Sequence, residues 1–166
     1  FSKYLGIDVV RYPQFPTEGE FHGADLSRGT ISLADSSAEV VAAVEIIEHV
    51  ENPRAFMREL ARLAKPGGWI VVTTPNQLSL LSLLTLVIKH RFSQFQDTHY
   101  PAHITALLEA DLMRMARECS LEEIEIAYSL QGRIVFSPWH FPAWLSRLFP
   151  RAFSDNLLII GRKADA

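Results

Sequence analysis

The sequence predicts an α/β layer fold in which helices pack on a mostly parallel sheet. Short apolar runs alternate along the chain with stretches of helical periodicity, and this alternation is the pattern of β-α units. The 166 residues, 48% hydrophobic and 21% charged, suit a single domain over 1–166 with a sizeable core. The same composition excludes a disordered or fibrous chain.

Six short apolar runs are predicted to form the strands of this sheet. The fourth contains Trp69-Ile70-Val71-Val72, an uninterrupted apolar run typical of a strand that is buried on both faces. The predicted strands are 4–9, 21–24, 39–44, 68–74, 121–128 and 156–162.

Two amphipathic helices are predicted between these strands. The first opens at Asn52-Pro53, because proline favours the first position of a helix. Lys-Pro-Gly-Gly at 65–68 ends it and reverses the chain, since proline cannot continue a helix and glycine allows positive φ. The apolar stripe of the first helix is Phe56, Leu60, Leu63 and Ala64, and the helix over 107–119 turns Leu108, Leu112, Met115 and Ala116 inward.

Two further segments interrupt the regular alternation. Residues 78–88 are rich in leucine but too few to span a membrane, so we expect a buried or interfacial helix. Residues 137–153 combine aromatic residues, prolines and two arginines, and we expect either a lid packed on the domain or an insertion that contacts a membrane surface.

Charge and cysteine content limit the partners and the compartment. A net charge of −3 without a basic block argues against broad capture of nucleic acid, so a small-molecule or amphiphilic substrate fits better. Cys119 is alone, which excludes an internal disulfide, and the first residues do not resemble a secretion signal. We therefore expect a cytoplasmic protein, with peripheral contact at the inner membrane face through 137–153 as an open option.

Two acids follow predicted strands, at the sheet edge where open α/β folds bind ligands. Asp8 ends the first run, where a carboxylate can accept both hydrogen bonds of a ribose diol. Asp25 follows the second run and could accept from the amine of an adenine ring, with Leu26 beside the ring. A turn or helix-cap role remains open for both acids.

An ordered set of motifs makes the interpretation specific. Glu48-His49 follows a buried strand, and the Asn-Pro helix start, the Lys-Pro-Gly-Gly turn, a strand and Thr-Pro-Asn at 74–76 come after it. In this order and spacing, the set resembles class I S-adenosylmethionine-dependent methyltransferases, in particular the type 11 and type 23 groups. The resemblance covers residues 4 to about 126, and the run at 156–163 resembles the last, antiparallel strand of that family.

The resemblance implies a Rossmann-like, three-layer α/β/α fold and a set of roles. It implies that Asp8 holds the ribose of S-adenosylmethionine, that Asp25 and Leu26 hold the adenine, and that Glu45 lies along the methionine part. The implied reaction is methyl transfer to a small-molecule or lipid-linked acceptor, with a hydroxyl as the expected group.

The chain departs from the family in one respect. No Gly-x-Gly loop occurs in it, although in these enzymes such a loop follows a first, central strand. We expect that strand, its loop and its helix to precede Phe1, because a sheet without its middle strand would leave buried backbone groups unpaired. Direct pairing of 4–9 with 39–44 would contradict this expectation.

Transfer to a hydroxyl is helped by a base, and four residues are candidates for that role. They are His49, Glu48, His103 and His99. The alternative for His49 is a structural role, in which its ring orients the loop through backbone hydrogen bonds.

The same run of residues also permits a metal site. Glu45, Glu48 and His49 stand at i, i+3 and i+4, so one helical turn would place them on one face, with His103 or His99 and water completing a site for a hard cation. The run resembles the metal site of small-RNA 2′-O-methyltransferases, and a similar run occurs in ubiquinone-pathway O-methyltransferases. Many relatives carry Glu-His without a metal, so no metal ligand is assigned.

Two other classes of function remain. One is a non-catalytic methyltransferase-like domain that cannot bind the cofactor in this form. The other is a nicotinamide-dependent oxidoreductase, which also carries an acid after its second strand. The Pro-Gly-Gly turn and the Glu-His run argue against the oxidoreductase.

Overall fold

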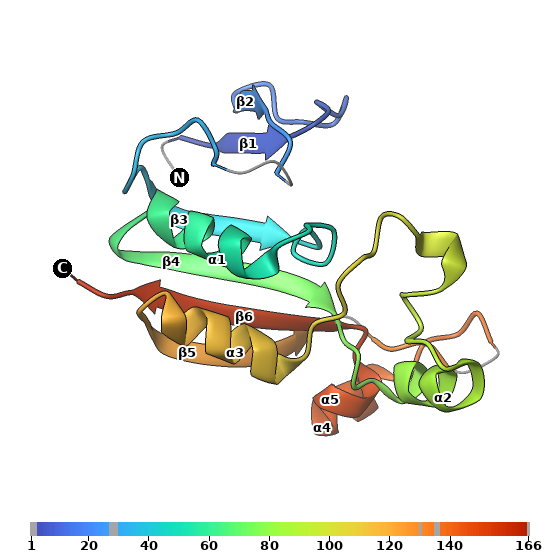
Figure 1. Cartoon of the computed structure of the whole chain (residues 1–166). Helices are drawn as coiled ribbons and strands as arrows, with labels where there is room; N and C mark the ends of the chain where they lie inside the picture. The colour runs from blue at the N-terminus through green and yellow to red at the C-terminus, as the bar shows by residue number, and fades with distance from the viewer. Residues whose placement is uncertain (1–2, 27–29, 130, 135–136, 166) are drawn as a thin grey trace.

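The computed structural model describes residues 3–26, 30–129, 131–134 and 137–165, and it has the expected alternation of strands and helices (Figure 1). All six predicted strands form, with bounds shifted by a few residues. The elements are β1 (Leu5–Asp8), β2 (Glu20–Gly23), β3 (Ala38–Val44), α1 (Pro53–Leu63), β4 (Ala64–Pro75), α2 (Leu80–Lys89), the 3₁₀ helix η1 (Asp97–His99), α3 (Glu109–Glu118), β5 (Leu121–Ser129), α4 (Ala143–Leu148), α5 (Pro150–Phe153) and β6 (Asn156–Lys163).

The larger sheet has four strands in the order β3-β4-β6-β5. β3 and β4 are parallel, whereas β6 is antiparallel to both of its neighbours, β4 and β5. β4 and β5 therefore run in the same direction on either side of β6. The prediction of a parallel arrangement with one antiparallel last strand is confirmed.

β1 and β2 form a separate, two-stranded parallel sheet. Among the described residues, β1 and β3 share no ladder of hydrogen bonds: β1 pairs with β2, and β3 pairs with β4. The chain that follows β2 is fastened to α1 instead. The Glu59 carboxylate accepts the backbone N–H of Ile31 at 2.6 Å, and Arg62 donates to the Leu33 and Ile31 carbonyls at 2.8 and 2.9 Å.

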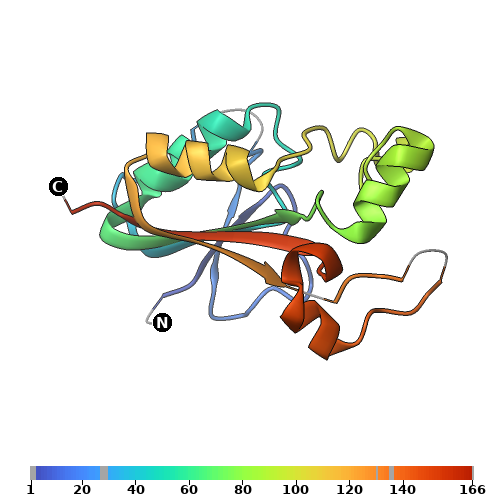
Figure 2. The same ribbon diagram turned by 90° about the horizontal axis from the view of Figure 1, so that it is seen from below.

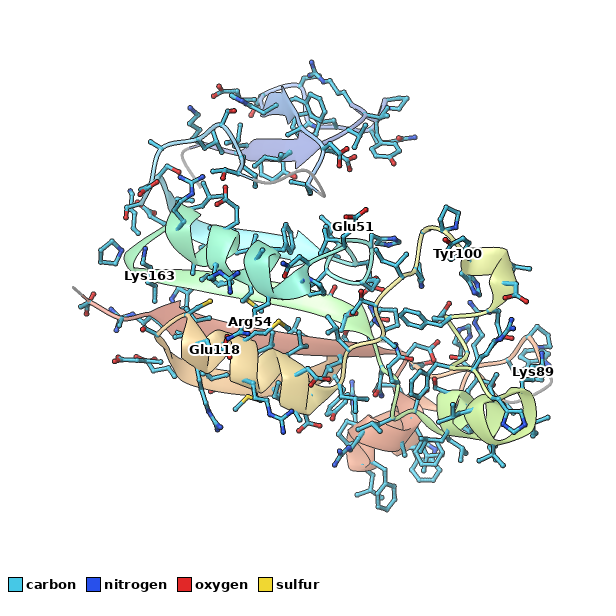
Figure 3. All side chains as sticks on the ribbon, viewed as in Figure 1. Glu51, Arg54, Lys89, Tyr100, Glu118 and Lys163 are labelled. Carbon is cyan, nitrogen blue, oxygen red and sulfur yellow. The ribbon has the colours of Figure 1, made fainter. Side chains whose placement is uncertain are left out.

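α1 and α3 lie side by side on one face of the four-stranded sheet (Figures 1 and 2). The side chain of Asn52 caps α1 by accepting the N–H of Ala55, as a residue before proline at the helix start can. An ion pair between Arg54 and Glu118, 2.6 Å long, joins the exposed sides of the two helices (Figure 3). The predicted stripe residues Phe56, Leu60 and Leu63 are buried on α1, whereas Ala64, expected on the helix, is buried at the start of β4. On α3, Leu112, Met115 and Ala116 are buried, and Leu108, just before the helix, is only half-buried.

The Lys-Pro-Gly-Gly segment differs from the simple turn predicted for it. Ala38 pairs with Ala64 and Val40 pairs with Trp69, so 65–68 form a wide bulge within β4. Gly67 has a φ of +70°, a backbone conformation that glycine adopts without the steric cost of a Cβ. The helix therefore ends at Leu63 and the chain enters the sheet directly.

The leucine-rich segment forms α2, and of the two alternatives expected for it, a buried or an interfacial helix, the buried one is wrong. Of its residues only Ser82 is buried, and Val87 is 73% exposed. α2 projects from the end of the sheet toward which β4 runs (Figure 1). None of the helices within the described ranges is long and apolar enough to cross a membrane.

Residues 137–153 form α4 and α5 on the side of the sheet opposite α1 and α3 (Figure 2). Asn76, directly after β4, donates to the Arg151 and Ser154 carbonyls at 2.8 and 2.9 Å. The segment is thus anchored at its end, while Trp139 and Trp144 stay largely exposed.

Candidate functional site

A cleft of about 360 Å³ opens where β1, β2 and β3 end. Asp8 and Asp25 line it from the two-stranded sheet, and Glu45 and His49 line it from the loop after β3. The volume is within the range of small-molecule sites. Four residues predicted from three separate segments of the chain therefore meet in one cavity, together with Leu26.

Asp8 lies at the end of β1 and is half-buried. Its Oδ1 accepts the backbone N–H of Val9 at 2.6 Å and that of Val10 at 3.4 Å. The turn role considered for this acid is therefore present, and it fixes the orientation of the carboxylate at the cleft. Asp25 is exposed after β2, and Leu26 packs against the edge of the hydrophobic core.

Glu45 directly follows β3 and has a φ of +53°, which is uncommon for a residue other than glycine. Its N–H and its Oε1 both bond to the Thr73 hydroxyl of β4, at 3.0 and 2.9 Å. Asn156 of β6 donates to the same Oε1 at 2.9 Å. These two strands hold the side chain at the cleft, and burial raises the pKa of the Glu45 carboxyl.

Glu48 is entirely buried beneath this loop. Its Oε2 accepts the Thr74 hydroxyl at 3.1 Å, whereas its Oε1 is buried with no hydrogen-bond partner. Burial, and secondarily the nearby charge of Glu45, raise the pKa of the Glu48 carboxyl. A buried carboxylate oxygen without a donor is costly, so this atom requires a physical explanation.

His49 and His103 lie beside that carboxylate. The Nε2 of His49 is 3.7 Å from Glu48 Oε1, and the two imidazole rings meet edge to face with centroids 4.6 Å apart. The backbone carbonyl of Glu48 accepts the N–H groups of Ile104 and Thr105, which docks the segment carrying His103 onto the loop. Burial, and then the proximity of His49, lower the pKa of His103.

The helical turn that was expected to place Glu45, Glu48 and His49 on one face does not form. Residues 46–49 instead form an isolated turn, closed by a hydrogen bond from the His49 N–H to the Ile46 carbonyl. The conformation of Glu45 directs its carboxylate to Thr73 and Asn156, so the expected common face with Glu48 and His49 does not form. The ring of His99 stacks on His103 at 5.5 Å, and its Nδ1 accepts the Gln96 N–H.

Four residues of this region were not identified from the sequence. Tyr12 lines the cleft beside Asp8, while Thr73, Thr74 and Asn156 hold the two glutamates. Thr74 is part of the Thr-Pro-Asn motif, but the sequence assigned it no role. Tyr12 does not directly follow a predicted strand, so its position did not mark it as a site residue. Asn156 bonds to a residue 111 positions away, a separation at which local patterns carry no information.

Comparison with known proteins gives a coherent result. The sequence profile of a family described as "Methyltransferase domain" matches residues 1–124. The chain is 34% identical over 88 residues to a ubiquinone biosynthesis O-methyltransferase of Thiobacillus denitrificans, which is 53% of this chain and 38% of that protein. It is 26% identical over 124 residues to a probable S-adenosylmethionine-dependent methyltransferase of Mycolicibacterium smegmatis, 72% of this chain and 44% of that protein. The chain thus spans less than half the length of these two relatives.

Solved structures show the same architecture. A methyltransferase from Archaeoglobus fulgidus, described as dependent on S-adenosylmethionine, aligns with 96% of this chain and 75% of its own length. The TM-score is 0.66 and the sequence identity is 17%, so the likeness concerns the fold. The predicted Rossmann-like class with a mixed sheet is confirmed.

Proposed function

Because this chain belongs to the class I methyltransferases that depend on S-adenosylmethionine, we propose that it transfers a methyl group to the hydroxyl of a small or lipid-linked acceptor. The relatives named as ubiquinone biosynthesis O-methyltransferases support a hydroxyl as the acceptor group. The observation that carries the proposal is the cleft shared by Asp8, Asp25, Glu45 and His49.

The two ends of the cleft suit the two ends of the cofactor. In this proposal Asp8 accepts the ribose hydroxyls, while Asp25 accepts the adenine amine and Leu26 packs on the ring. Glu45, held by Thr73 and Asn156, attracts the cationic methionine part. The cofactor supplies a methyl group on a positively charged sulfonium, so a cleft lined by three carboxylates is electrostatically complementary to it.

The acceptor is assigned to the side of the cleft formed by His49, Glu48 and His103. Methyl transfer by in-line displacement depends mainly on holding the acceptor oxygen close to the methyl carbon and aligned with it. His49 is the member of this group that also lines the cleft, so it stands between the cofactor and the buried carboxylate. A hydroxyl placed there has groups beside it that assist the loss of its proton.

Calorimetry with S-adenosylmethionine, S-adenosylhomocysteine and NAD tests the proposal on the full chain. We expect binding of the first two and not of NAD. Binding of none of the three would favour the non-catalytic domain, and binding of NAD alone would favour the oxidoreductase.

A second test concerns His49. The variant His49→Ala should lower kcat about 10²-fold or more if this residue assists at the acceptor, with the Kd of S-adenosylhomocysteine changed less than threefold. An equal loss of kcat and of affinity for S-adenosylhomocysteine would mean that the ring of His49 only supports the loop, through its hydrogen bond with the Ala102 carbonyl.

We also propose that the protein binds its acceptor at the surface of an anionic lipid bilayer. Val87 and Ile88 of α2, Trp139, and Trp144 of α4 have exposed apolar side chains. The helices α2 and α4 lie toward the same end of the molecule (Figures 1 and 2). The sequence has no Asp or Glu between 60 and 96 or between 126 and 154, although the whole chain is acidic.

Basic side chains accompany these apolar ones. Lys89 ends α2 (Figure 3), and Arg147 lies in the last turn of α4. An apolar surface with positive charge at its margin is the composition of helices that lie at an anionic lipid boundary. The contact extends the one expected for 137–153 to include α2.

Co-sedimentation with vesicles tests this surface. The protein should bind vesicles that contain phosphatidylglycerol, bind phosphatidylcholine vesicles less, and release at high salt. Trp139→Ala combined with Trp144→Ala should abolish binding, whereas Val40→Ala, an exposed apolar residue of β3, should retain it. Absence of binding by the unaltered protein would overturn the proposal.

A further inference from the structure

The chain that connects β1 to β2 forms turns in place of a helix. The two strands are parallel, and a crossover between parallel strands usually contains a helix. Residues 9–19, all of which the structure describes, form two successive turns instead, and we call them the crossover loop. In the first turn the N–H of Phe15 donates to the Tyr12 carbonyl at 3.0 Å, and in the second the N–H of Gly19 donates to the Pro16 carbonyl at 3.1 Å.

The sequence of the crossover loop favours both turns. Pro13 stands at the second position of the first turn, where its fixed φ suits the backbone, and Gly19 closes the second turn. The N–H of Glu20 then donates to the Tyr4 carbonyl at 2.9 Å, which begins the pairing of β2 with β1. The loop therefore has a defined shape, although it contains no helix.

The ring of Phe15 anchors the crossover loop on the two-stranded sheet. Its centroid lies 5.6 Å from that of Tyr4 and 5.6 Å from that of Phe21. Gly6 of β1 leaves the space that this ring occupies, because a Cβ at Gly6 would overlap it. The Arg11 guanidinium stands over the same ring, 5.2 Å from its centroid, in the geometry of a cation–π contact. The middle of the loop is thus fixed in place.

This anchoring holds Tyr12 at the cleft. Tyr12 begins the first turn and lines the cleft together with Asp8, Asp25 and Leu26. It is nevertheless 61% exposed, so the folded chain covers less than half of its surface. Aromatic side chains in such a position commonly supply the apolar contact area of a small-molecule site. The exposed ring is therefore available to a molecule bound in the cleft.

The other residues of the cleft indicate which part of a ligand this ring contacts. Tyr12 and His49 supply the aromatic rings among the described residues that line the cleft, and His49 is assigned to the acceptor. Leu26, assigned to the adenine, packs against the edge of the core, so its side chain forms a supported apolar wall. A planar base has two faces, and Tyr12 is the remaining ring for the face that Leu26 does not cover.

From these contacts, and resting on the proposed function, we propose that Tyr12 stacks on the adenine of the cofactor and makes the site selective for ligands that carry a planar base. Stacking joins the π-face of a base to an aromatic ring and does not depend on the hydrogen-bond pattern of the base. Asp25 then selects adenine through its amine, while Tyr12 supplies affinity for the ring itself. Phe15 and Gly6 are positioning residues, because they act through the placement of Tyr12.

Two ligands that differ only by the base test this role in a calorimeter. They are S-adenosylhomocysteine and S-ribosylhomocysteine, which keeps the ribose and the amino acid but has no base. Tyr12→Leu should weaken binding of S-adenosylhomocysteine about tenfold or more and that of S-ribosylhomocysteine less than about twofold. Tyr12→Phe keeps the ring and should retain both affinities. Stacking also reduces the ultraviolet absorption of a base, so difference spectra should show this reduction with the unaltered protein and Tyr12→Phe but not with Tyr12→Leu.

Tyr100→Leu is the matched control, and Gly6→Ala tests the anchor. Tyr100 is exposed and stands directly before a proline, as Tyr12 does, but it is not among the described residues that line the cleft, so its affinity for S-adenosylhomocysteine should be unaltered. Gly6→Ala displaces Phe15 and should weaken that affinity. In protein that already carries Tyr12→Leu, Gly6→Ala should weaken it little further, since the two changes act on one contact. Far-UV circular dichroism identifies variants that do not fold.

Equal affinity of Tyr12→Leu and the unaltered chain for S-adenosylhomocysteine would overturn the inference. An equal loss of affinity for both ligands would also overturn it, because Tyr12 would then act on the ribose or on the loop and not on the base. A loss in Tyr12→Phe as large as in Tyr12→Leu would assign the effect to the hydroxyl. All three results leave the methyltransferase proposal intact, whereas failure of the unaltered chain to bind S-adenosylhomocysteine would overturn both proposals.

Discussion

The carboxylate of Asp8 is oriented before any ligand arrives, because Oδ1 already accepts two backbone amides of the following turn. Asp8→Ala should weaken binding of S-adenosylhomocysteine by about 1.5 to 3 kcal/mol for each charge-assisted bond lost, or about ten- to hundredfold in Kd. Isothermal titration measures this change. Glu18→Ala, an exposed acid on the β1–β2 connection, should leave the Kd unaltered. Equal affinities of Asp8→Ala and the unaltered protein would remove Asp8 from the binding site.

Glu59 joins the segment after β2 to α1, and its role can be tested by pH. The bonds from Arg62, followed by the N–H of Ile31, hold the pKa of Glu59 below its ordinary value. Because the pKa is lower in the folded state, the stabilisation is complete above the unfolded pKa of about 4.5 and is lost as pH falls through the folded pKa.

Glu59→Gln should therefore reduce the free energy of unfolding by about 1 to 2 kcal/mol at pH 7. The difference from the unaltered protein should shrink when urea unfolding is repeated below pH 4. Glu51→Gln, an exposed acid before α1, serves as the control. A difference that stays constant with pH would show that charge is not what Glu59 contributes.

The individual site residues were predictable to unequal degrees. Asp8 and Asp25 each follow a strand, and the ends of parallel strands gather ligand-binding groups at one edge, so position selected these two, whereas Glu45 came from the family resemblance. Thr73 and Asn156 were not predictable, because a hydroxyl inside a strand and an amide at the start of another become partners only when β4 and β6 pair. That Glu48 Oε1 is buried without a hydrogen-bond partner among the described residues is likewise visible only in the folded structure.

At the scale of elements, the bulge at 65–68 depends on a glycine for reasons of space. A Cβ at Gly68 would lie 2.9 Å from the Lys65 carbonyl oxygen and 3.0 Å from that of Glu39. Gly68→Ala should lower stability by about 1 to 3 kcal/mol, since backbone atoms cannot move aside as a flexible side chain can. Chemical denaturation provides the measurement.

Gly23 offers the matched comparison in the other sheet. Among the described residues, a Cβ there would meet Phe21 alone, at 3.9 Å, which is ordinary contact. Gly23→Ala should change the free energy of unfolding by less than about 0.5 kcal/mol. If both alanines were tolerated equally, the bulge would have to be more adaptable than its contacts indicate.

The elements themselves were largely predictable, because helix and strand periodicities and the Asn-Pro start are local signals. The bulge was not, since a helix stop and a strand irregularity use the same Pro and Gly residues. The sequence also did not decide between a buried and an interfacial α2. An apolar composition predicts that a helix avoids water, but it does not state which surface covers it.

At the scale of the whole molecule, Glu59 and Arg62 bond the segment after β2 to α1, and among the described residues β1 and β2 share no ladder of hydrogen bonds with the four-stranded sheet. Backbone amides of β1 and β2 should exchange with deuterium at least tenfold faster than those of β4 and β6, because small sheets open without global unfolding. Addition of S-adenosylhomocysteine should slow exchange in β1 and β2, since its proposed contacts include both walls of the cleft.

Hydrogen exchange followed by mass spectrometry resolves these segments. The protection of α1 and α3 serves as the internal reference, as both helices pack on the four-stranded sheet. Uniform protection of all strands without ligand would contradict the expectation of independent opening.

The acids of the cleft come from two sheets that share no ladder of hydrogen bonds among the described residues. A ligand that contacts Asp8 and Glu45 at once would link the two sheets, so the chain saturated with such a ligand should unfold in a sharper thermal transition than the free chain.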